Sequence, residues 1–488
     1  MRGGPVVGFD LDMTLVDSRP GIQRVWDEVS AVSGLPIDSA LSVTRLGPPL
    51  AVEAAYWVGP EGIPDVVACY REHYARFAIE PTLSLPGAHE AMDAVRADGG
   101  SVLVVTAKNV THARLHLDHL GLPADVVVGD LWGAAKGAAL REHGASVYVG
   151  DHVHDIDGAR AADAVAVSVA TGPSSAHELT ASGADAVLAD LTEFPGWWRE
   201  HLLDVRLAVL EERLRGWDRV VVAFSGGADS AFLLAAATRV IGPDHVVAAT
   251  AVSASLPAAE LAGAREFAAS LGVRHITPET HELSRAGYRA NDGDRCAHCK
   301  AELVDVLNAL AADPSMAAAE AAVLTGTNAD DARAGFRPGI AAAADRGAQT
   351  PLLDAGLTKS QVRAASRRWG LVTADKPAAA CLSSRVAFGV EVTSWRLARI
   401  ERAEVAVRRV LTTYGLTVWD LRVRDLGEAA RIEADRDLLT RLDDAGAEAS
   451  EAVVVAVLEA GFAAADVDPS GFRSGSMNEL LSDPQRFR

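Results

Sequence analysis

Cysteine, basic charge and long apolar runs are all scarce in this sequence. Four cysteines among 488 residues cannot form a disulfide scaffold. The 46 basic residues are outnumbered by 66 acidic ones, and the net charge of −20 argues against nucleic acid as a partner held mainly by electrostatic attraction. No apolar run approaches the length of a membrane span and no apolar signal segment opens the chain, so we expect a cytoplasmic protein with no membrane partner.

Length and hydrophobic pattern predict several α/β domains. A chain of 488 residues is too long for one ordinary core. The strand and helix alternation stops near residue 200, where residues 202–214 have the pattern of one amphipathic, charge-rich helix. We predict domains over residues 1–198, 203–380 and 381–479, with a tail at 480–488. The first two should form doubly wound parallel sheets and the third a small α+β domain.

A strand, a glycine turn and an apolar helix at residues 219–231 predict a nucleotide site. The turn reads Ser225-Gly226-Gly227-Ala228-Asp229-Ser230. Glycines let the backbone approach an anion closely, and the free amides of a helix start favour negative charge. We expect Ser225 and Ser230 to donate hydroxyl hydrogens and Asp229 to hold Mg²⁺ or to order the loop. A Walker loop is excluded because no lysine follows the last glycine.

This Ser-Gly-Gly-x-Asp-Ser pattern resembles the PP-loop of ATP pyrophosphatases. The resemblance implies that ATP is bound here and split into AMP and pyrophosphate while an oxygen of a second substrate is adenylylated. The residues that it assigns to ATP are Ser225, Gly226, Gly227, Asp229 and Ser230.

Another group of polar residues follows strands in the first domain. Residues 6–9 are apolar and lead into Asp10-Leu11-Asp12-Met13-Thr14, so two carboxylates leave one strand together. A second strand ends in Thr106, Lys136 follows, and a later strand ends in residues 150–155, which include Asp151 and Asp155. The carboxyl ends of parallel strands meet at one edge of a sheet, so we expect these side chains to converge there.

The order of these motifs resembles the haloacid dehalogenase superfamily. The likeness covers residues 4–195, and helices at about 18–85 match the cap of phosphoglycolate-phosphatase-like members. It implies that Asp10 attacks phosphorus and that Asp12 protonates the leaving group and later activates water. Thr106 and Lys136 would hold the phosphoryl group. The expected Mg²⁺ ligands are Asp10, Asp12, Asp151 and Asp155.

The second half of the chain resembles the LarE family over residues 203–479. The likeness is carried by the PP-loop and by residues 322–331, 336–339, 350–354, 356–359, 375–385 and 471–479. LarE enzymes insert sulfur during synthesis of a nickel-pincer cofactor. The resemblance implies that ATP adenylylates a carboxylate of pyridinium-3,5-dicarboxylate mononucleotide, and that sulfur then displaces AMP to leave a thiocarboxylate.

The LarE resemblance also implies residue roles. Cys381 matches the position at which some members surrender their own sulfur and keep dehydroalanine. Other members hold an iron–sulfur cluster on three cysteines, for which Cys296, Cys299 and Cys381 are the candidates for a [4Fe-4S] cluster, and both sulfur sources stay open. Anion-binding roles fall to Arg385 for the substrate and to Arg422 and Arg424 for its phosphate. An acid assisting sulfur release is expected at Glu433.

Two alternatives to this bifunctional enzyme remain at this point. A PP-loop enzyme could instead thiolate tRNA, although the acidic charge and the lack of a recognisable RNA module argue against it. The first domain could be a non-catalytic scaffold or sensor, although its full set of acids and Lys136 argues for catalysis. We expect small nucleotides as substrates and a homo-oligomeric assembly.

Overall fold

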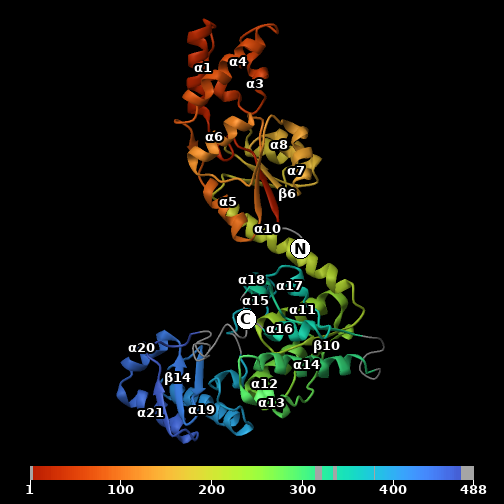
Figure 1. Ribbon diagram of the computed structural model, residues 1–488, viewed down its shortest axis with the longest axis vertical. Helices are drawn as coiled ribbons and strands as arrows, with labels where there is room; N and C mark the ends of the chain where they lie inside the picture. Colours follow the sequence, from red (N-terminus) through yellow and green to blue (C-terminus); the bar gives the residue numbers. More distant parts are fainter. Residues whose placement is uncertain (1–3, 314–320, 334–337, 378–379, 474–488) are drawn as a thin grey trace. The chain divides into compact units, whose positions relative to one another are not determined.

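The protein forms two compact units, Met1–Leu202 and Leu203–Arg488. The computed structural model describes residues 4–313, 321–333, 338–377 and 380–473 (Figure 1). Outside them lie the predicted tail at 480–488, most of the 471–479 motif, and Ala378 and Ala379 of the 375–385 motif. The predicted third domain at 381–479 is part of the second unit.

The first unit is built on a six-stranded parallel sheet of order β5-β4-β1-β6-β7-β8. Along β4 and β6, alternate residues enter different cores, with Val104 and Val149 on one face and Leu103 and Tyr148 on the other. Two apolar faces require helices on both sides, which is the doubly wound arrangement. The strands are β1 (Val6–Phe9), β4 (Ser101–Val105), β5 (Val126–Val128), β6 (Ala145–Gly150), β7 (Val165–Val169) and β8 (Ala186–Leu188).

Helices α5 to α9 connect these strands, and a separate helical cap is inserted after β1. The cap has its own core, in which Trp26 of α1 packs on Tyr70 of α4 with ring centroids 4.7 Å apart. It joins the sheet domain through the short antiparallel pair β2 (Val16–Asp17) and β3 (Leu83–Ser84). The main helices are α1 (Arg19–Ser33), α3 (Leu50–Ala54), α4 (Ile63–Phe77), α5 (Ala88–Ala97), α6 (Val110–Leu120), α7 (Lys136–Glu142), α8 (Val153–Ala161) and α9 (Ala176–Ala181).

A second parallel sheet, of order β11-β10-β9-β12, organises the second unit. Val220 and Val222 of β9 enter one core and Val221 enters the other, so this sheet is also covered on both faces. Both predictions of an α/β fold with parallel sheets are confirmed. The elements are β9 (Val220–Ala223), α11 (Ala228–Ile241), β10 (Val246–Ala249), α12 (Ala258–Ser270), β11 (Arg274–Ile276), α14 (Arg295–Ala311), β12 (Ala322–Thr325) and α18 (Lys359–Arg368).

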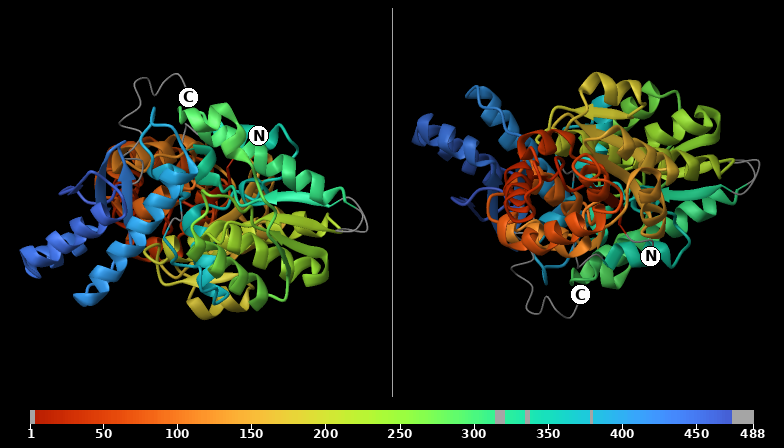
Figure 2. Two further views of the ribbon diagram at one scale, coloured as in Figure 1. Left: turned by 90° about the horizontal axis from the view of Figure 1, so that it is seen from below. Right: turned by 90° about the horizontal axis from the view of Figure 1, so that it is seen from above.

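The end of the described chain forms a small mixed sheet beside two helices. Strand β13 (Leu421–Asp425) pairs antiparallel with β14 (Ala429–Ala434), which pairs parallel with β15 (Ala464–Val467). Helices α19 (Ser394–Thr413) and α21 (Ala447–Glu459) contact each other (Figure 2). Their apolar residues share one core with the sheet, which is the α+β arrangement that we predicted for this segment.

Helix α10 (Phe194–Arg215) begins well before the residue 202 that we predicted. The Phe-Pro-Gly sequence at its start suggested a break, but proline is compatible with the first turn of a helix because the amide it lacks would have no helical partner there. Phe194 and Trp198 pack in the core of the first unit, and Leu207 and Leu214 in that of the second.

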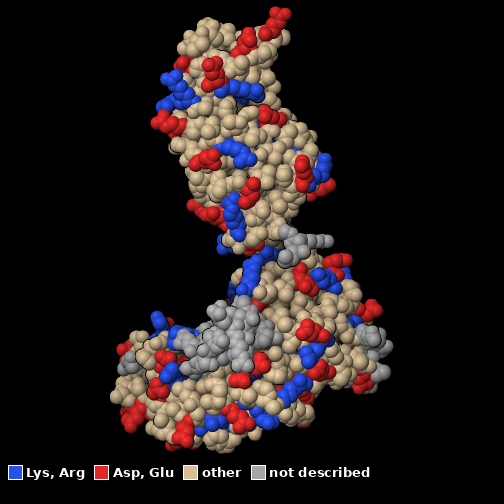
Figure 3. All heavy atoms as spheres, viewed as in Figure 1, with Lys and Arg blue, Asp and Glu red and all other residues tan. Residues whose placement is uncertain are grey.

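Charged side chains of both signs are mixed on the surface (Figure 3). On the face shown in Figure 3, the described Lys and Arg side chains are interspersed with Asp and Glu, and no continuous basic stripe crosses it. None of the helices in the described ranges is both long enough and apolar enough to cross a membrane.

A glycine substitution tests the packing of the first unit. Gly87 has a φ of +82°, and a Cβ there would lie 2.2 Å from backbone atoms of Leu191 and Thr192. Gly87→Ala should lower the free energy of unfolding of this unit by about 3 kcal/mol, through backbone strain and overpacking. Gly34→Ala is the control, because φ is +70° but the space is open, and it should cost about 1 kcal/mol. Equal losses by chemical denaturation would contradict this packing.

Candidate active sites

Three acids converge at the carboxyl edge of the first sheet. Asp10 directly follows β1, Asp151 follows β6, and Asp155 lies in the first turn of α8. One carboxylate oxygen from each lies within 4.8 Å of the others. Thr14 donates a 2.8 Å hydrogen bond to Asp151 and so helps to orient it.

Burial of these acids creates a need for positive charge. Burial raises the pKa of Asp10 to about 7, with repulsion from Asp155 and Asp12 adding to the rise and Lys136 opposing it. Burial, with repulsion from Asp155 and Asp10, raises the pKa of Asp151 well above its ordinary value. Oxygen ligands gathered in this way fit Mg²⁺, so the residues present suit the ion that the sequence predicted.

Lys136 already supplies one cation to this edge. Its side chain is 1% exposed, and its Nζ lies 2.7 Å from Asp155 Oδ1 and 3.1 Å from Asp10 Oδ1. Burial opposes its charge, but the two carboxylates together raise the pKa of Lys136 above its ordinary value. Thr106 is buried directly after β4, and its Oγ1 accepts a 3.2 Å hydrogen bond from the Lys108 amide. Lys136 therefore lies beside the acids, and Thr106 follows the strand that pairs with β1, which leads into Asp10.

Asp12 does not join the group of three acids. Its carboxylate lies 3.0 Å from Lys108 Nζ and accepts a hydrogen bond from Ser18. Burial would raise the pKa of Asp12, but Lys108 and Ser18 together lower it below its ordinary value. Sequence reasoning missed Lys108, although its place two residues after Thr106, at the same strand end, could have indicated it.

The cap closes a cavity of about 230 Å³ over Asp12 and Lys108. Tyr74 of the cap accepts a hydrogen bond from Lys108, and its hydroxyl lies 2.9 Å from His116 Nε2. The ring of Tyr74 stacks on His112 with centroids 4.2 Å apart. Cap and sheet domain thus meet directly at the acid that was predicted to protonate the leaving group.

The predicted phosphate loop of the second unit, residues 225–230, turns at a left-handed glycine, a conformation that glycine adopts readily. Gly226 has a φ of +73°. The hydroxyls of Ser225 and Ser230 lie 3.1 Å apart, and Ser230 donates a 3.1 Å hydrogen bond to the Gly227 carbonyl. The loop lines a cavity of about 320 Å³, to which Lys300 also contributes. This is room for part of a nucleotide.

Asp229 is the acidic residue of this loop, and one of its carboxylate oxygens accepts no hydrogen bond from the described residues. Its Oδ1 is buried without a hydrogen-bond partner among the described residues. Burial raises the pKa of Asp229, Asp331 adds to the rise, and Lys359 opposes it. A buried, unpartnered oxygen beside a second carboxylate fits a divalent cation bound with nucleotide phosphates.

Cys296, Cys299 and Cys381 lie in one neighbourhood. Cys296 and Cys381 are exposed, whereas Cys299 is partly buried. Burial, followed by the nearby Cys381, Glu282 and Cys296, raises the pKa of Cys299 to about 12. In the described part of the chain, however, only the Asp10 group brings three candidate ligand atoms within 4.8 Å of one another.

Buried polar contacts fix the segment that presents Cys381. The hydroxyls of Tyr288 and Ser383 lie 2.5 Å apart, and Arg295 donates a 2.8 Å hydrogen bond to the Ser383 carbonyl. The Leu382 amide donates to the Ser255 carbonyl over 2.8 Å. These contacts hold the backbone next to Cys381 while its thiol stays exposed.

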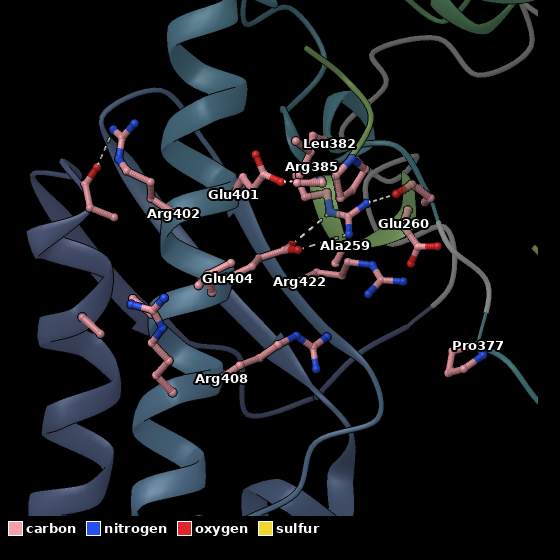
Figure 4. Close-up of a pocket in the computed structure, with 18 of the residues that line it drawn as sticks. Ala259, Glu260, Pro377, Leu382, Arg385, Glu401, Arg402, Glu404, Arg408 and Arg422 are labelled. Carbon is pink, nitrogen blue, oxygen red and sulfur yellow. Dashed lines mark hydrogen bonds and ion pairs between the residues drawn. The ribbon is translucent and has the colours of Figure 1, made fainter. Parts of the chain in front are cut away.

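Arg385 and Arg422 line a cavity of about 760 Å³ near this segment (Figure 4). Arg385 lies 3.0 Å from Glu404 and donates a 2.8 Å hydrogen bond to the Cys381 carbonyl. Burial and then the neighbouring Arg385 lower the pKa of Arg422, because its charge is partly desolvated beside another cation. Two buried guanidiniums facing one cavity favour an anionic ligand. Glu404, which orients Arg385, was missed from the sequence.

Arg424 and Glu433 lie next to this cavity as a buried ion pair. Their side chains are 2.7 Å apart and less than a tenth exposed. Residues two apart on a strand share a face, so Arg422 and Arg424 project together while Leu421 and Val423 enter the core. Glu433 is thus engaged by Arg424, and Arg424 also donates to the Ser384 carbonyl over 3.2 Å.

Known proteins match both halves of the chain. A family model described as a haloacid dehalogenase-like hydrolase matches residues 5–163. Phosphoglycolate phosphatase of Yersinia pseudotuberculosis is 30% identical over 208 residues, covering 38% of this chain and 90% of that enzyme. Pyridinium-3,5-bisthiocarboxylic acid mononucleotide synthase of Lactiplantibacillus plantarum is 32% identical over 287 residues, covering 58% of this chain and 97% of that synthase. The chain belongs to the LarE family. Its first unit is a haloacid dehalogenase-like hydrolase domain.

The chain is also similar to the uncharacterized protein slr1717 of Synechocystis. It is 36% identical over 282 residues, which cover 58% of this chain and 100% of that protein. The Synechocystis protein and the synthase are thus matched over all or nearly all of their length by 58% of this LarE-family chain. The chain has the hydrolase domain in addition to that part.

Alkylation tests the cysteine environment of this LarE-family protein. A rise in the pKa of Cys299 from an ordinary 9.0 to about 12 lowers its thiolate fraction at pH 8 about a thousandfold, and the thiolate is the reactive form. In chelator-treated protein, iodoacetamide should therefore modify the exposed Cys381 and Cys296 at least about a hundredfold faster than Cys299. Peptide mass analysis over time would measure this, and equal rates would contradict the burial of Cys299.

Proposed function

We propose that the second unit is an ATP-dependent sulfurtransferase acting on pyridinium-3,5-dicarboxylate mononucleotide. The observation that carries the proposal is the match to nearly the whole length of the bisthiocarboxylic acid mononucleotide synthase. The phosphate loop, the exposed Cys381 and the arginine-lined cavity of the same unit support it. A mononucleotide carries a phosphate and carboxylates, which guanidinium groups bind well.

The reaction divides into activation and sulfur transfer. A substrate carboxylate oxygen attacks the α-phosphorus of ATP, and the bond to pyrophosphate breaks with its electron pair leaving on pyrophosphate. The Cys381 thiolate then attacks the activated carbonyl carbon, and the bond to AMP breaks. Loss of the Cα proton and cleavage of the Cβ–S bond leave dehydroalanine at position 381 and a thiocarboxylate on the product. Glu433 would assist this last step, and its ion-pair partner Arg424 donates a hydrogen bond to the carbonyl of Ser384 in the segment that contains Cys381.

A cluster on Cys296, Cys299 and Cys381 is the alternative source of sulfur. Cys381 and Cys296 both lie close enough to Cys299 to raise the pKa of its thiol, which supports this alternative. If such a cluster is bound, it would carry external sulfide and spare Cys381. The arginine-lined cavity and the phosphate loop would then have the same roles as in the first scheme.

We propose that the first unit is a Mg²⁺-dependent phosphatase. Asp10 would attack phosphorus, Asp12 would protonate the leaving group, and Lys136 with Thr106 would neutralise the transferred group. The buried set of acids supports catalysis over a scaffold role, because unneutralised buried carboxylates are costly to keep without a function. The cavity of about 230 Å³ suits a phosphate monoester smaller than a mononucleotide.

Mass analysis of Cys381 tests the sulfurtransferase. The full chain is incubated anaerobically with Mg-ATP and pyridinium-3,5-dicarboxylate mononucleotide, and AMP is followed in parallel. We expect the Cys381 peptide to lose the mass of H₂S as AMP and thiocarboxylate form. Product with an intact Cys381 would favour the cluster. Absence of both AMP and product would contradict the substrate assignment.

Asp10→Asn separates the two proposed activities. Phosphate release from small phosphate monoesters should fall by at least about a thousandfold, because an amide cannot act as the nucleophile. AMP formation by the second unit should stay unchanged. Lys108→Met is a useful companion, since it removes the cation beside Asp12 without touching the nucleophile. Phosphate release unaffected by Asp10→Asn would support the scaffold alternative.

A further inference from the structure

Lys376 is a charged residue to which neither proposed step has assigned a role. It lies in the stretch that leads to Cys381, directly after Asp375. Its Nζ donates a 2.9 Å hydrogen bond to the carbonyl of Gly226 in the phosphate loop. It also forms a 2.6 Å ion pair with Glu260 of α12. Lys376 thus joins two motifs that are 150 residues apart in the sequence.

The position of this ammonium is fixed from the backbone side. Arg363 of α18 donates hydrogen bonds of 3.0 Å to the Ala374 carbonyl and 2.8 Å to the Lys376 carbonyl. Both bonds come from one guanidinium, so the turn before Pro377 is clamped in one place. The side chain therefore reaches the phosphate loop from a stable base and loses little further conformational freedom in doing so.

Lys376 is associated with both cavities of the second unit. It contacts the loop that lines the nucleotide cavity, and it lines the 760 Å³ cavity together with Arg385 and Arg422. Those arginines line only the larger cavity, and Lys300 lines only the smaller one. In the proposed reaction the α-phosphate of ATP must meet a substrate carboxylate, and a cation associated with both cavities is suited to that step.

We propose that Lys376 is a catalytic residue of adenylyl transfer that binds the α-phosphate, an inference that rests on the proposed sulfurtransferase function. Its ammonium exchanges the Gly226 carbonyl for an α-phosphate oxygen when ATP binds. As the carboxylate oxygen bonds to phosphorus and the bond to pyrophosphate breaks, negative charge grows on the phosphoryl oxygens. Lys376 stabilises that charge, and no proton is transferred.

The competing explanation is that Lys376 only ties the phosphate loop to α12 through Glu260. The two roles make opposite predictions for the two partners of the ion pair. A structural tie is lost equally when either partner is neutralised. A phosphate-binding cation is lost only when Lys376 itself is replaced. Glu260→Gln keeps the ammonium and removes a carboxylate that competes with phosphate for it.

The test is substrate-dependent exchange of labelled pyrophosphate into ATP, measured on the full chain with Mg²⁺ and pyridinium-3,5-dicarboxylate mononucleotide. Lys376→Gln should lower the exchange rate at saturating ATP by about a hundredfold or more, the usual effect of losing one transition-state donor. Glu260→Gln should stay within about threefold of the unsubstituted protein, and Lys376→Arg should recover at least about tenfold over Lys376→Gln, because it keeps the charge.

Each other result overturns a defined statement. Equal losses in Lys376→Gln and Glu260→Gln would establish the tie and overturn the catalytic role, and so would normal exchange in Lys376→Gln. If Lys376→Gln does not fold, Lys376→Arg still decides, since exchange no higher than in an unreactive control would overturn the role. Exchange absent from the unsubstituted protein would instead contradict the proposed function itself.

Discussion

Parallel strand pairing is the constraint on which the chemistry of this protein depends. In both large sheets every strand pair is parallel, so the chain leaves each strand at the same edge. In the first unit this brings Asp10 beside Asp151, although more than a hundred residues separate them in the sequence. In the second unit it places the phosphate loop after β9 beside the residues that follow β12. Neither site could be built on neighbouring residues alone.

Buried charge is the second feature that the two units share. Lys136 is almost fully buried between two carboxylates, and Arg424 is buried against Glu433. Such groups are costly to desolvate, and a net stabilisation from them is small. In the functions proposed above, the acids of the first unit would hold a cation and the arginines of the second would hold an anion.

The LarE part and the hydrolase part are built separately, each around its own sheet. Each has its own parallel sheet, two cores on the faces of that sheet, and its own cavity. Their cavities differ in character: that of the first unit is small and closed by a cap, whereas the arginine-lined cavity of the second is more than three times as large. The two proposed activities are therefore consistent with different substrates, a smaller one for the first unit and a larger anionic one for the second.

The sequence by itself was sufficient for the fold class, the family and most of the residue types in each site. Glycine turns, acid pairs and strand periodicity are local patterns, so they can be read without knowing what lies across the sheet. Only the tertiary structure decided which of these residues meet. It paired Asp12 with Lys108 instead of with the other acids, it paired Glu433 with Arg424, and it brought Lys376 to the phosphate loop. The physical reason is that an ion pair depends on side chains reaching across elements, and that distance is set by packing and not by spacing along the chain.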